Sequence, residues 1–390
     1  DTFSSRGLGD VYKRQLPEFF WVTNYLETLL SAVTWKPITN ATIAREFRTL
    51  VDEYAELTGC SDSPTDLQCH DFSMRGLSFV EDSVFSSLGH MTYFNGTDSM
   101  PVKQALKYFY DADPMTGVTV PATEHSVMCM GSKDKEIDTF ERLLKLYPAG
   151  IVSIVSDTWD FWKVLTSYTV LLKELIEDRE DIVDEDGNVL VPGRTIFRPD
   201  SGDPVKILTG YKPSEYFESG DSYYCRNTGV ELAEHEVKGA VEVLYDIFGG
   251  SETEEGFKVL NSSVGLIYGD SITLHRCEAI MARLAAKGFA SCNVVFGIGS
   301  YTYQYNTRDT LGIAFKATAG TRGGEHVELF KDPKTDNGTK KSAKGYLKVI
   351  DGELYDQQPN DDGGDLEVIF KNGKMVRKTS WNDVRMRAML

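Results

Sequence analysis

Four short apolar runs, each closing in a turn with glycine or aspartate, constrain the fold of this chain more than any other feature. They are IVSIVSD (to Asp157), RTIFRPDSGD (to Asp203), VGLIYGD (to Asp270) and NVVFGIGS (to Ser300). The stretches between consecutive runs are long enough for a crossover helix, so the runs predict parallel strands of an α/β fold. Parallel strands joined by helices place all their carboxyl ends on one face.

Polar residues follow these strands on the face where the carboxyl ends meet. We expect three acids (Asp157, Asp200 and Asp270), one cation (Arg198) and a glycine-flanked turn (Gly297 to Gly299) to converge there. Carboxylates and the backbone donors of a glycine-rich turn suit a sugar phosphate better than an apolar ligand. The sequence therefore predicts a polar ligand site at this face of the sheet.

The charge balance restricts the partners of the chain. Its 390 residues hold 41 Lys and Arg against 59 Asp and Glu, a net charge of −18. We therefore expect no broad attraction to nucleic acid or to an anionic membrane, and an anionic substrate needs a local cluster of cations. No apolar run approaches the roughly 20 residues of a membrane span, and no segment has the order of a signal peptide. The expected compartment is the cytoplasm.

The six cysteines are scattered, with neither Cys-x-x-Cys nor paired His spacing. This pattern does not fit a disulfide framework or a structural zinc site, so we expect free and mostly buried thiols.

Helical periodicity and turn signals divide the chain into four regions. Residues 1–15 lack periodicity and are interpreted as a non-native leader, and residues 16–59 as two helices left from a truncated N-terminal domain. Residues 60–308 hold the predicted barrel, with helices at 135–146, 159–177, 231–248 and 271–287 and further short strands at 88–95 and 118–120. Residues 309–390 predict an antiparallel lobe, because Asp351-Gly352 and Asn372-Gly373 are hairpin turns; Ser380 with Asp383 caps a terminal helix.

Each candidate site residue also has a purely structural interpretation. RPDSGDP (198–204) is also a pattern for a capped turn with a surface salt bridge, and Gly269-Asp270 for a helix N-cap. Because several such motifs are expected to meet at one face of the sheet, a ligand-binding role is favoured over these structural alternatives. Phe72 and Arg75 could stack on and donate to a flat heterocycle, but a core aromatic with a surface Arg fits their spacing better.

Two further groups carry the same ambiguity. Asp98 and the Glu124-His125 pair are more often structural groups than catalytic ones. A basic segment after the glycine turn is either solvated or binds an anion, and its position favours anion binding. Its residues are Arg308, Lys316, Lys331, Lys340 and Lys341.

Taken together, these motifs resemble the nicotinamide phosphoribosyltransferase family from about Phe20 to the C-terminus. Ten blocks occur in the order and approximate spacing of that family: HDFSMRG, FNGTD, VPATEH, VSDTWD, FRPDSGDP, YGD, FGIGS, NTRDTLGIAFK, FKDP and FKNGK. The resemblance implies an α/β fold with an irregular TIM-like barrel and a second, partly antiparallel α+β domain. It also implies a head-to-tail homodimer with shared active sites.

The resemblance further implies transfer of phosphoribose from phosphoribosyl pyrophosphate to nicotinamide, with Mg²⁺ and with ATP as an activating co-substrate. By motif, Phe72 would stack on the pyridine ring, and Asp98 would accept from the carboxamide. Arg75 and Arg198 would line the base pocket. His125 matches the histidine that is phosphorylated when ATP hydrolysis is coupled to turnover.

The remaining matched residues are implied to hold the sugar phosphate. Asp200, Gly269 and Asp270 would bind the ribose hydroxyls, and Asp157 would lie near the phosphate and the metal. Gly299 and Ser300 would meet the 5′-phosphate. Arg308 and Lys316 would reach the same phosphate from a second subunit.

The chain departs from the family pattern in two places. Ser300 stands where the family has a second glycine. The family's N-terminal region, which supplies an aromatic that closes the base site and an Arg for pyrophosphate, is not in this chain. A truncated, inactive member that binds only nucleotide or a partner subunit is therefore one rival reading. A glycosidase that uses paired carboxylates is the other, although a neutral glycan has no need of the basic segment.

Overall fold

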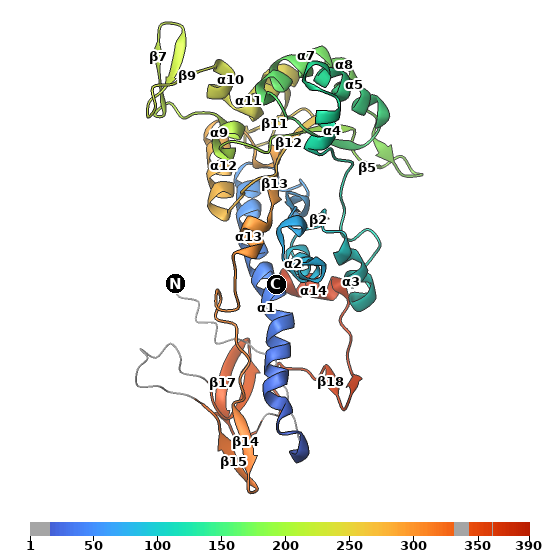
Figure 1. Cartoon of the computed structure of the whole chain (residues 1–390), viewed down its shortest axis with the longest axis vertical. Helices are drawn as coiled ribbons and strands as arrows, with labels where there is room; N and C mark the ends of the chain where they lie inside the picture. The colour runs from blue at the N-terminus through green and yellow to red at the C-terminus, as the bar shows by residue number, and fades with distance from the viewer. Residues whose placement is uncertain (1–15, 331–342, 361) are drawn as a thin grey trace.

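The computed structural model describes residues 16–330, 343–360 and 362–390. The predicted leader and three residues of the basic segment, Lys331, Lys340 and Lys341, lie outside the described residues. The described residues form a mixed α/β structure elongated along one long helix (Figure 1).

A six-stranded parallel sheet forms the centre of the fold. Its order is β2-β1-β13-β12-β6-β3, and every neighbouring pair is parallel. The strands are β1 (Cys69–Asp71), β2 (Gly96–Thr97), β3 (Ile151–Val155), β6 (Arg194–Arg198), β12 (Val264–Tyr268) and β13 (Val294–Ile298). The four predicted parallel strands are thus confirmed. All five residues of β12 are buried, as expected of a strand covered on both faces.

The two edges of this sheet are connected through residues 118–122. Val118 forms a parallel bridge with Gly96 at one edge, and Ala122 forms one with Ser153 at the other. The Thr97 N–H donates to the Val118 carbonyl at 3.0 Å, and the Ser153 N–H to the Pro121 carbonyl at 2.9 Å. The predicted strand at 118–120 is therefore a bridging segment without a regular ladder. Among the described residues the parallel sheet has six strands, and a complete eight-stranded barrel is not shown.

Helices surround the sheet (Figure 1). Two predicted helices are confirmed as α5 (Glu136–Leu146) and α12 (Leu274–Ala286). Further helices are α2 (Val80–Met91), α3 (Pro101–Tyr110), α4 (His125–Met130), α9 (Pro204–Thr209), α10 (Glu234–Lys238), α11 (Ala240–Phe248), α13 (Ser300–Gln304) and α14 (Trp381–Ala388). In α14, Ser380 and Asp383 form the predicted capping box.

Two predicted helices are interrupted. The helix at 231–248 breaks into α10 and α11 at Gly239, whose φ is 83°. A Cβ there would lie 2.2 Å from the Gly210 nitrogen, so the break lets two backbone segments approach. The helix at 159–177 is divided into α6 (Phe161–Lys163), a π-helical turn (Val164–Tyr168), α7 (Thr169–Leu171) and α8 (Lys173–Glu177).

Two other predictions are wrong. The two helices expected within residues 17–58 are one helix, α1 (Val22–Leu57), which contains Pro37. It packs so closely on α2 that a Cβ at Gly89 would lie 2.6 Å from the Pro37 carbonyl oxygen, and this contact supports the helix across the proline. The strand expected at 88–95 begins as the last turn of α2, because a short apolar run does not distinguish strand from helix.

The antiparallel lobe lies beside the N-terminal half of α1 (Figure 1). Its hairpins are β14 (Ala319–Arg322) with β15 (Glu325–Glu328), β16 (Tyr346–Ile350) with β17 (Glu353–Gln358), and β18 (Phe370–Lys371) with β19 (Lys374–Met375). The predicted turns are confirmed: Asp351 and Asn372 both have φ of 50°. The Ala317 N–H donates to Glu27 at 2.7 Å and ties the start of the lobe to α1.

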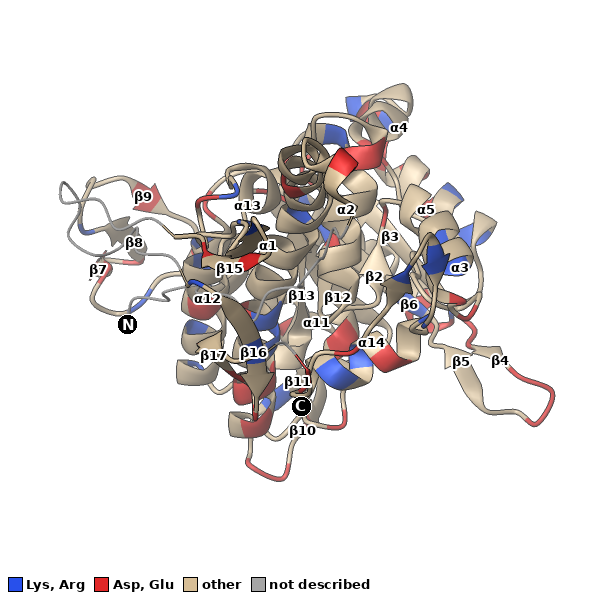
Figure 2. Ribbon diagram, turned by 90° about the horizontal axis from the view of Figure 1, so that it is seen from below, with Lys and Arg blue, Asp and Glu red and all other residues tan. Residues whose placement is uncertain are grey.

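Sequence reasoning missed three small antiparallel sheets. They are β4 (Ile182–Val183) with β5 (Val189–Val191), β7 (Tyr216–Ser219) with β8 (Ser222–Cys225) and β9 (Glu231–Leu232), and β10 (Gly250–Glu252) with β11 (Lys258–Leu260). Seen from below, basic and acidic residues are interspersed over the helices, and the β4–β5 turn is acidic (Figure 2). All six cysteines are free thiols, and four of them are buried, as expected. In the described part of the chain, no helix has the length and apolar content needed to cross a membrane.

A buried ion pair joins α1 to α2. The Lys36 ammonium donates to Asp82 at 2.7 Å and to the Gln304 side chain of α13 at 2.8 Å. The Lys36 side chain is 7% exposed and that of Asp82 11% exposed. Removing one partner leaves the other charge buried without compensation, and such losses are large.

We therefore expect Lys36→Met to lower the free energy of unfolding by about 3 kcal/mol, and the double variant Lys36→Met/Asp82→Leu to recover part of that loss. Urea unfolding measures both. Lys145→Met removes an exposed pair with Glu141 and serves as the control, with an expected change below about 0.5 kcal/mol. Equal effects of Lys36→Met and Lys145→Met would contradict this view of the ion pair.

Candidate active site

A cavity of about 430 Å³ opens at the carboxyl ends of the parallel strands. It is lined by Phe72, Met74, Arg75, Phe79, Val80, Asp98, Ser99, Glu124, Arg198, Asp200 and Gly269. Six of these are predicted site residues: Phe72, Arg75, Asp98, Arg198, Asp200 and Gly269. They come from the ends of four strands, so the sheet brings together side chains that lie far apart in the sequence.

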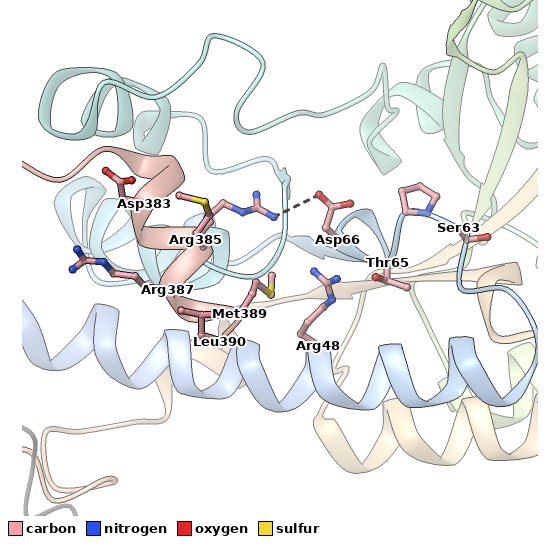
Figure 3. A pocket seen from close by; sticks show the side chains of 11 residues that line it. Arg48, Ser63, Thr65, Asp66, Asp383, Arg385, Arg387, Met389 and Leu390 are labelled. Atoms are coloured by element: carbon pink, nitrogen blue, oxygen red, sulfur yellow. Dashed lines mark ion pairs between the residues drawn. The ribbon is translucent and has the colours of Figure 1, made fainter. Parts of the chain in front are cut away.

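A larger hollow of about 1000 Å³ lies elsewhere and contains none of the predicted residues. Its lining includes Arg48 of α1, the segment before β1 from Ser63 to Asp66, and Arg385 of α14, which pairs with Asp66 (Figure 3). Because this segment leads into β1, the hollow lies toward the amino ends of the strands. Ligand sites in parallel α/β folds lie at the opposite end, so the smaller cavity is the candidate active site.

The Phe72 ring lies against two glycines in the floor of the cavity. A Cβ at Gly297 would lie 2.5 Å from the ring and 2.8 Å from the Gly269 Cα, and a Cβ at Gly269 would lie 3.6 Å from the ring. The Phe72 N–H donates to the Ile298 carbonyl at 2.9 Å, which fixes the residue at the end of β1. Gly297, which was expected in an anion-binding turn, therefore packs against the Phe72 ring and leaves room for it.

The Asp98 carboxylate also lines the cavity and is held by two side chains. Its Oδ1 contacts His70 Nε2 at 2.9 Å and accepts from Thr119 Oγ1 at 2.5 Å. Burial favours the neutral acid, but the hydrogen bonds from His70 and Thr119 and the charge of Arg198 outweigh it and lower the pKa of Asp98. Asp98 is thus an anion at neutral pH.

Sequence reasoning missed His70 as a site residue, although it lies in the HDFSMRG block. It lies two residues before Phe72, and alternation along an extended strand places both side chains on the same face. The two rings are 4.9 Å apart between centroids. Strand alternation was therefore the signal that could have found His70.

Asp157 contacts two other predicted site residues, Asp200 and His125, and its side chain is 6% exposed. Its Oδ2 accepts from the Asp200 N–H at 3.0 Å and from Ser201 Oγ at 2.5 Å, while its Oδ1 contacts His125 Nε2 at 3.0 Å. Both oxygens are engaged by protein groups, so Asp157 positions the Asp200 turn and the His125 ring. Burial raises the pKa of Asp200. The positive charge of Arg198 lowers that pKa and the negative charge of Asp157 raises it, and the net effect is a raised pKa.

Arg198 is a buried cation in the cavity wall, with its side chain 8% exposed. Its Nη2 donates to the Thr123 carbonyl at 3.0 Å and lies 3.8 Å from Glu124. Within the described residues its Nε is buried without a hydrogen-bond partner. Glu124, which the sequence analysis named only as the neighbour of His125, also lies 4.0 Å from Arg75, whose side chain is 79% exposed. Glu124 therefore lies within ion-pair distance of both Arg198 and Arg75.

Other predicted residues lie outside the cavity lining. Asp270 follows Gly269 and is exposed, with its carboxylate accepting from Ser271 Oγ at 2.5 Å. Gly299 precedes α13 and faces open space. A Cβ at Gly76 would lie 2.0 Å from Ser300 Oγ, so Ser300 neighbours the turn that follows Phe72.

Arg308 and Lys316 lie further along the chain and are exposed. Arg308 pairs with its neighbour Asp309 at 2.7 Å, and neither residue lines the cavity of its own chain. As for metals, the described residues contain no cluster of three or more His, Cys, Asp or Glu side chains placed to hold an ion.

The sequence of this chain is similar to a known protein family. Residues 67–373 match the profile of the Nicotinate phosphoribosyltransferase (NAPRTase) family. This chain belongs to that family. The match includes every residue of the cavity lining.

Three proteins with similar sequences are all named nicotinamide phosphoribosyltransferase. The chain is 50% identical over 95% of its length to a nicotinamide phosphoribosyltransferase of Acinetobacter baylyi, and spans 70% of that protein. It is 35% identical over 85% of its length to one of Mycoplasma pneumoniae, spanning 65% of it, and 30% identical over 95% to one of Xanthomonas campestris pv. campestris, spanning 72%.

A substitution at Gly297 tests the close contact between this glycine and the Phe72 ring. We expect Gly297→Ala to destabilise the protein by about 2 kcal/mol, because the added methyl displaces the ring or shifts the backbone. Gly299→Ala, where a Cβ meets nothing within 4 Å, is the matched control and should change stability by less than about 0.5 kcal/mol. Scanning calorimetry measures both, and a neutral Gly297→Ala would contradict the described contact.

A buried histidine beneath the site predicts a pH dependence. Burial lowers the pKa of His90 from 6.5 to about 4, although the charge of Asp71 opposes this shift and His70 adds to it. Its Nδ1 contacts the Tyr303 hydroxyl at 2.7 Å, and its Nε2 the Gly96 carbonyl at 3.1 Å.

Because the unfolded chain binds this proton more readily than the folded one, the contribution of His90 is complete above pH 6.5 and is lost as the pH falls toward 4. We expect the free energy of unfolding to decrease over this range, with a shallower slope in His90→Gln. Urea unfolding at a series of pH values gives both slopes, and identical slopes would contradict the assignment.

Proposed function

We propose that this chain transfers phosphoribose from phosphoribosyl pyrophosphate to nicotinamide, forming nicotinamide mononucleotide and pyrophosphate in NAD salvage. The observation that carries the proposal is a cavity with an aromatic floor, Phe72, and an ionised wall, Asp98. Family membership and the names of the similar curated proteins support the same reaction.

In this proposal the cavity binds the base by stacking and by a charged hydrogen bond. The pyridine ring lies on Phe72, and its carboxamide N–H donates to the Asp98 carboxylate. Arg198 and Arg75 line the same cavity. Nicotinate would bring a second carboxylate next to Asp98, and two like charges at close range are unfavourable. Asp98 therefore selects the amide over the acid.

Residues at the other strand ends hold the sugar phosphate in this proposal. Asp200, Gly269 and Asp270 meet the ribose hydroxyls, and Gly299 and Ser300 flank the 5′-phosphate.

Arg308 and Lys316 complete the phosphate site from a second copy of the chain. They are exposed and lie outside the cavity lining of their own chain. A head-to-tail dimer would therefore share its two active sites.

The reaction requires little acid-base chemistry from the protein. The pyridine nitrogen attacks C1′ of the ribose with a free lone pair and has no proton to lose, so no general base is needed. As the bond to pyrophosphate breaks, the ring gains oxocarbenium character, which the nearby carboxylates favour. Holding the base and the ribose in line supplies much of the remaining rate. Mg²⁺ is proposed to arrive with the pyrophosphate group, whose charge it neutralises.

His125 is proposed to accept a phosphoryl group when ATP is coupled to turnover. Its side chain is 43% exposed, and Asp157 holds its Nε2 at 3.0 Å. A neutral imidazole that donates from Nε2 carries its lone pair on Nδ1. Asp157 therefore orients the ring and favours the tautomer in which Nδ1 is the nucleophile.

The finer architecture is also a proposal. The bridges of residues 118–122 to both sheet edges support an irregular TIM-like barrel within 60–308, followed by the antiparallel lobe at 309–390. The rival of an inactive, binding-only member is not favoured, because the family and the names of the similar proteins support an enzyme, and this chain has the carboxylates that the proposal uses, Asp98, Asp157 and Asp200.

The direct test is pyrophosphate release from phosphoribosyl pyrophosphate. We expect release only when nicotinamide is added, together with one equivalent of nicotinamide mononucleotide. Binding of that mononucleotide without turnover would support the inactive rival instead. Hydrolysis of a glycoside without pyrophosphate release would support a glycosidase.

The role of Asp98 gives a specific prediction. We expect Asp98→Ser to lower the ratio of kcat/KM for nicotinamide to that for nicotinate at least about tenfold, because the repulsion of the second carboxylate is removed. Asp221→Ser, an exposed aspartate between β7 and β8, is the control and should leave the ratio unchanged. An unchanged ratio in Asp98→Ser would refute this source of selectivity.

A further inference from the structure

A buried threonine anchors the segment that carries Asp98. Thr97 is fully buried at the end of β2. Its hydroxyl donates to Asp71 Oδ2 at 3.1 Å and accepts the Ser99 N–H at 3.0 Å. These two bonds hold the residues on either side of Asp98, so the peptide at the cavity wall is fixed at both ends.

Asp71, the partner of Thr97, also anchors the segment that carries Phe72. Its Oδ1 accepts from the N–H and the hydroxyl of Ser73 at 2.9 and 2.6 Å, and its main-chain carbonyl accepts the Asp98 N–H at 2.9 Å. Phe72 lies between Asp71 and Ser73. One buried residue therefore bonds both the segment with the stacking ring and the segment with the selective carboxylate.

These bonds keep the Asp71 charge compatible with burial. Burial raises the pKa of Asp71, but the hydrogen bonds from Ser73 and Ser87, and at acidic pH the charge of the protonated His90 ring, outweigh this effect and lower that pKa. The Ser87 hydroxyl of α2 donates to Oδ2 at 2.6 Å. Oδ2 therefore has two hydroxyl donors, of which only Thr97 lies in the segment that carries Asp98.

We propose that Thr97 is a positioning residue that sets the place of the Asp98 carboxylate relative to the Phe72 ring, and thereby the affinity and selectivity for the amide base. This inference rests on the proposed function. Thr97 touches no substrate: it acts through Asp98, whose carboxylate must meet a carboxamide while the ring remains stacked. A hydrogen bond to a carboxylate is sensitive to displacements well below 1 Å.

Three substitutions separate positioning from general stability. Thr97→Val keeps the shape but loses both hydrogen bonds and leaves the Ser99 N–H unpaired. Thr97→Ser keeps both bonds and is the conservative rescue. Ser87→Ala removes the other hydroxyl that donates to Asp71 Oδ2. Ser87 does not line the cavity, and the lining residue nearest to it in sequence, Val80, is seven positions away. Thr97→Val and Ser87→Ala should therefore both lower stability.

Steady-state kinetics with both substrates give the first readout. We expect Thr97→Val to raise the KM for nicotinamide about tenfold and to reduce the preference over nicotinate, with little change in the KM for phosphoribosyl pyrophosphate. Thr97→Ser and Ser87→Ala should retain the wild-type values within about twofold. Equal changes in both KM values, or equal effects of Thr97→Val and Ser87→Ala, would overturn the proposal.

Crystal structures of the same variants give a readout that does not depend on turnover. The contact between Asp98 Oδ1 and His70 Nε2, 2.9 Å in the wild type, should persist in Thr97→Ser and Ser87→Ala and be broken in Thr97→Val. Its retention in Thr97→Val would overturn the positioning role. A wild type that releases no pyrophosphate would instead contradict the proposed function, so the two failures are distinguishable.

Discussion

The parallel alignment of six strands is the constraint on which the candidate site depends. Five cavity residues are the last residue of a strand or lie one or two positions beyond it: Phe72, Asp98, Arg198, Asp200 and Gly269. If one strand ran in the opposite direction, its terminal side chains would lie at the other face of the sheet. The hydrogen-bonded order β2-β1-β13-β12-β6-β3 therefore decides which acids and rings can act together.

The site is organised before any ligand binds. Asp157 and Asp98 each hold at least two hydrogen-bonding partners from the protein, which fixes where their charges lie. The carboxylates of Asp98 and Asp200 differ in environment: the pKa of Asp98 is lowered and that of Asp200 is raised. Ordered carboxylates of this kind suit a reaction in which positive charge develops on a sugar ring, because little reorganisation is then needed at the transition state.

Much of this arrangement could be predicted from sequence, because buried strands leave a strong local signal. The runs before Asp157, Asp200 and Gly269 are apolar and end in turns, so both the strands and the acids that follow them were identified. Phe72 and Asp98 were harder, since β1 and β2 have only three and two residues and no apolar run. Their place in the site came from the family resemblance.

The features that could not be predicted from the sequence depend on contacts between segments that lie far apart in the chain. The role of Gly297 depends on a ring that lies 225 residues earlier in the chain, and the continuity of α1 through Pro37 depends on its packing against α2. His70 was missed because it belongs to a very short strand. Thr97 looked like an ordinary member of the FNGTD block until its two bonds were known.

The measurement that tests the central claim most directly is a crystal structure of the protein with nicotinamide bound. The account predicts a pyridine ring stacked on Phe72, with the carboxamide nitrogen within hydrogen-bond distance of Asp98. Nicotinamide bound in the hollow beside Arg48 and Arg385, or in the cavity with its amide turned away from Asp98, would contradict it.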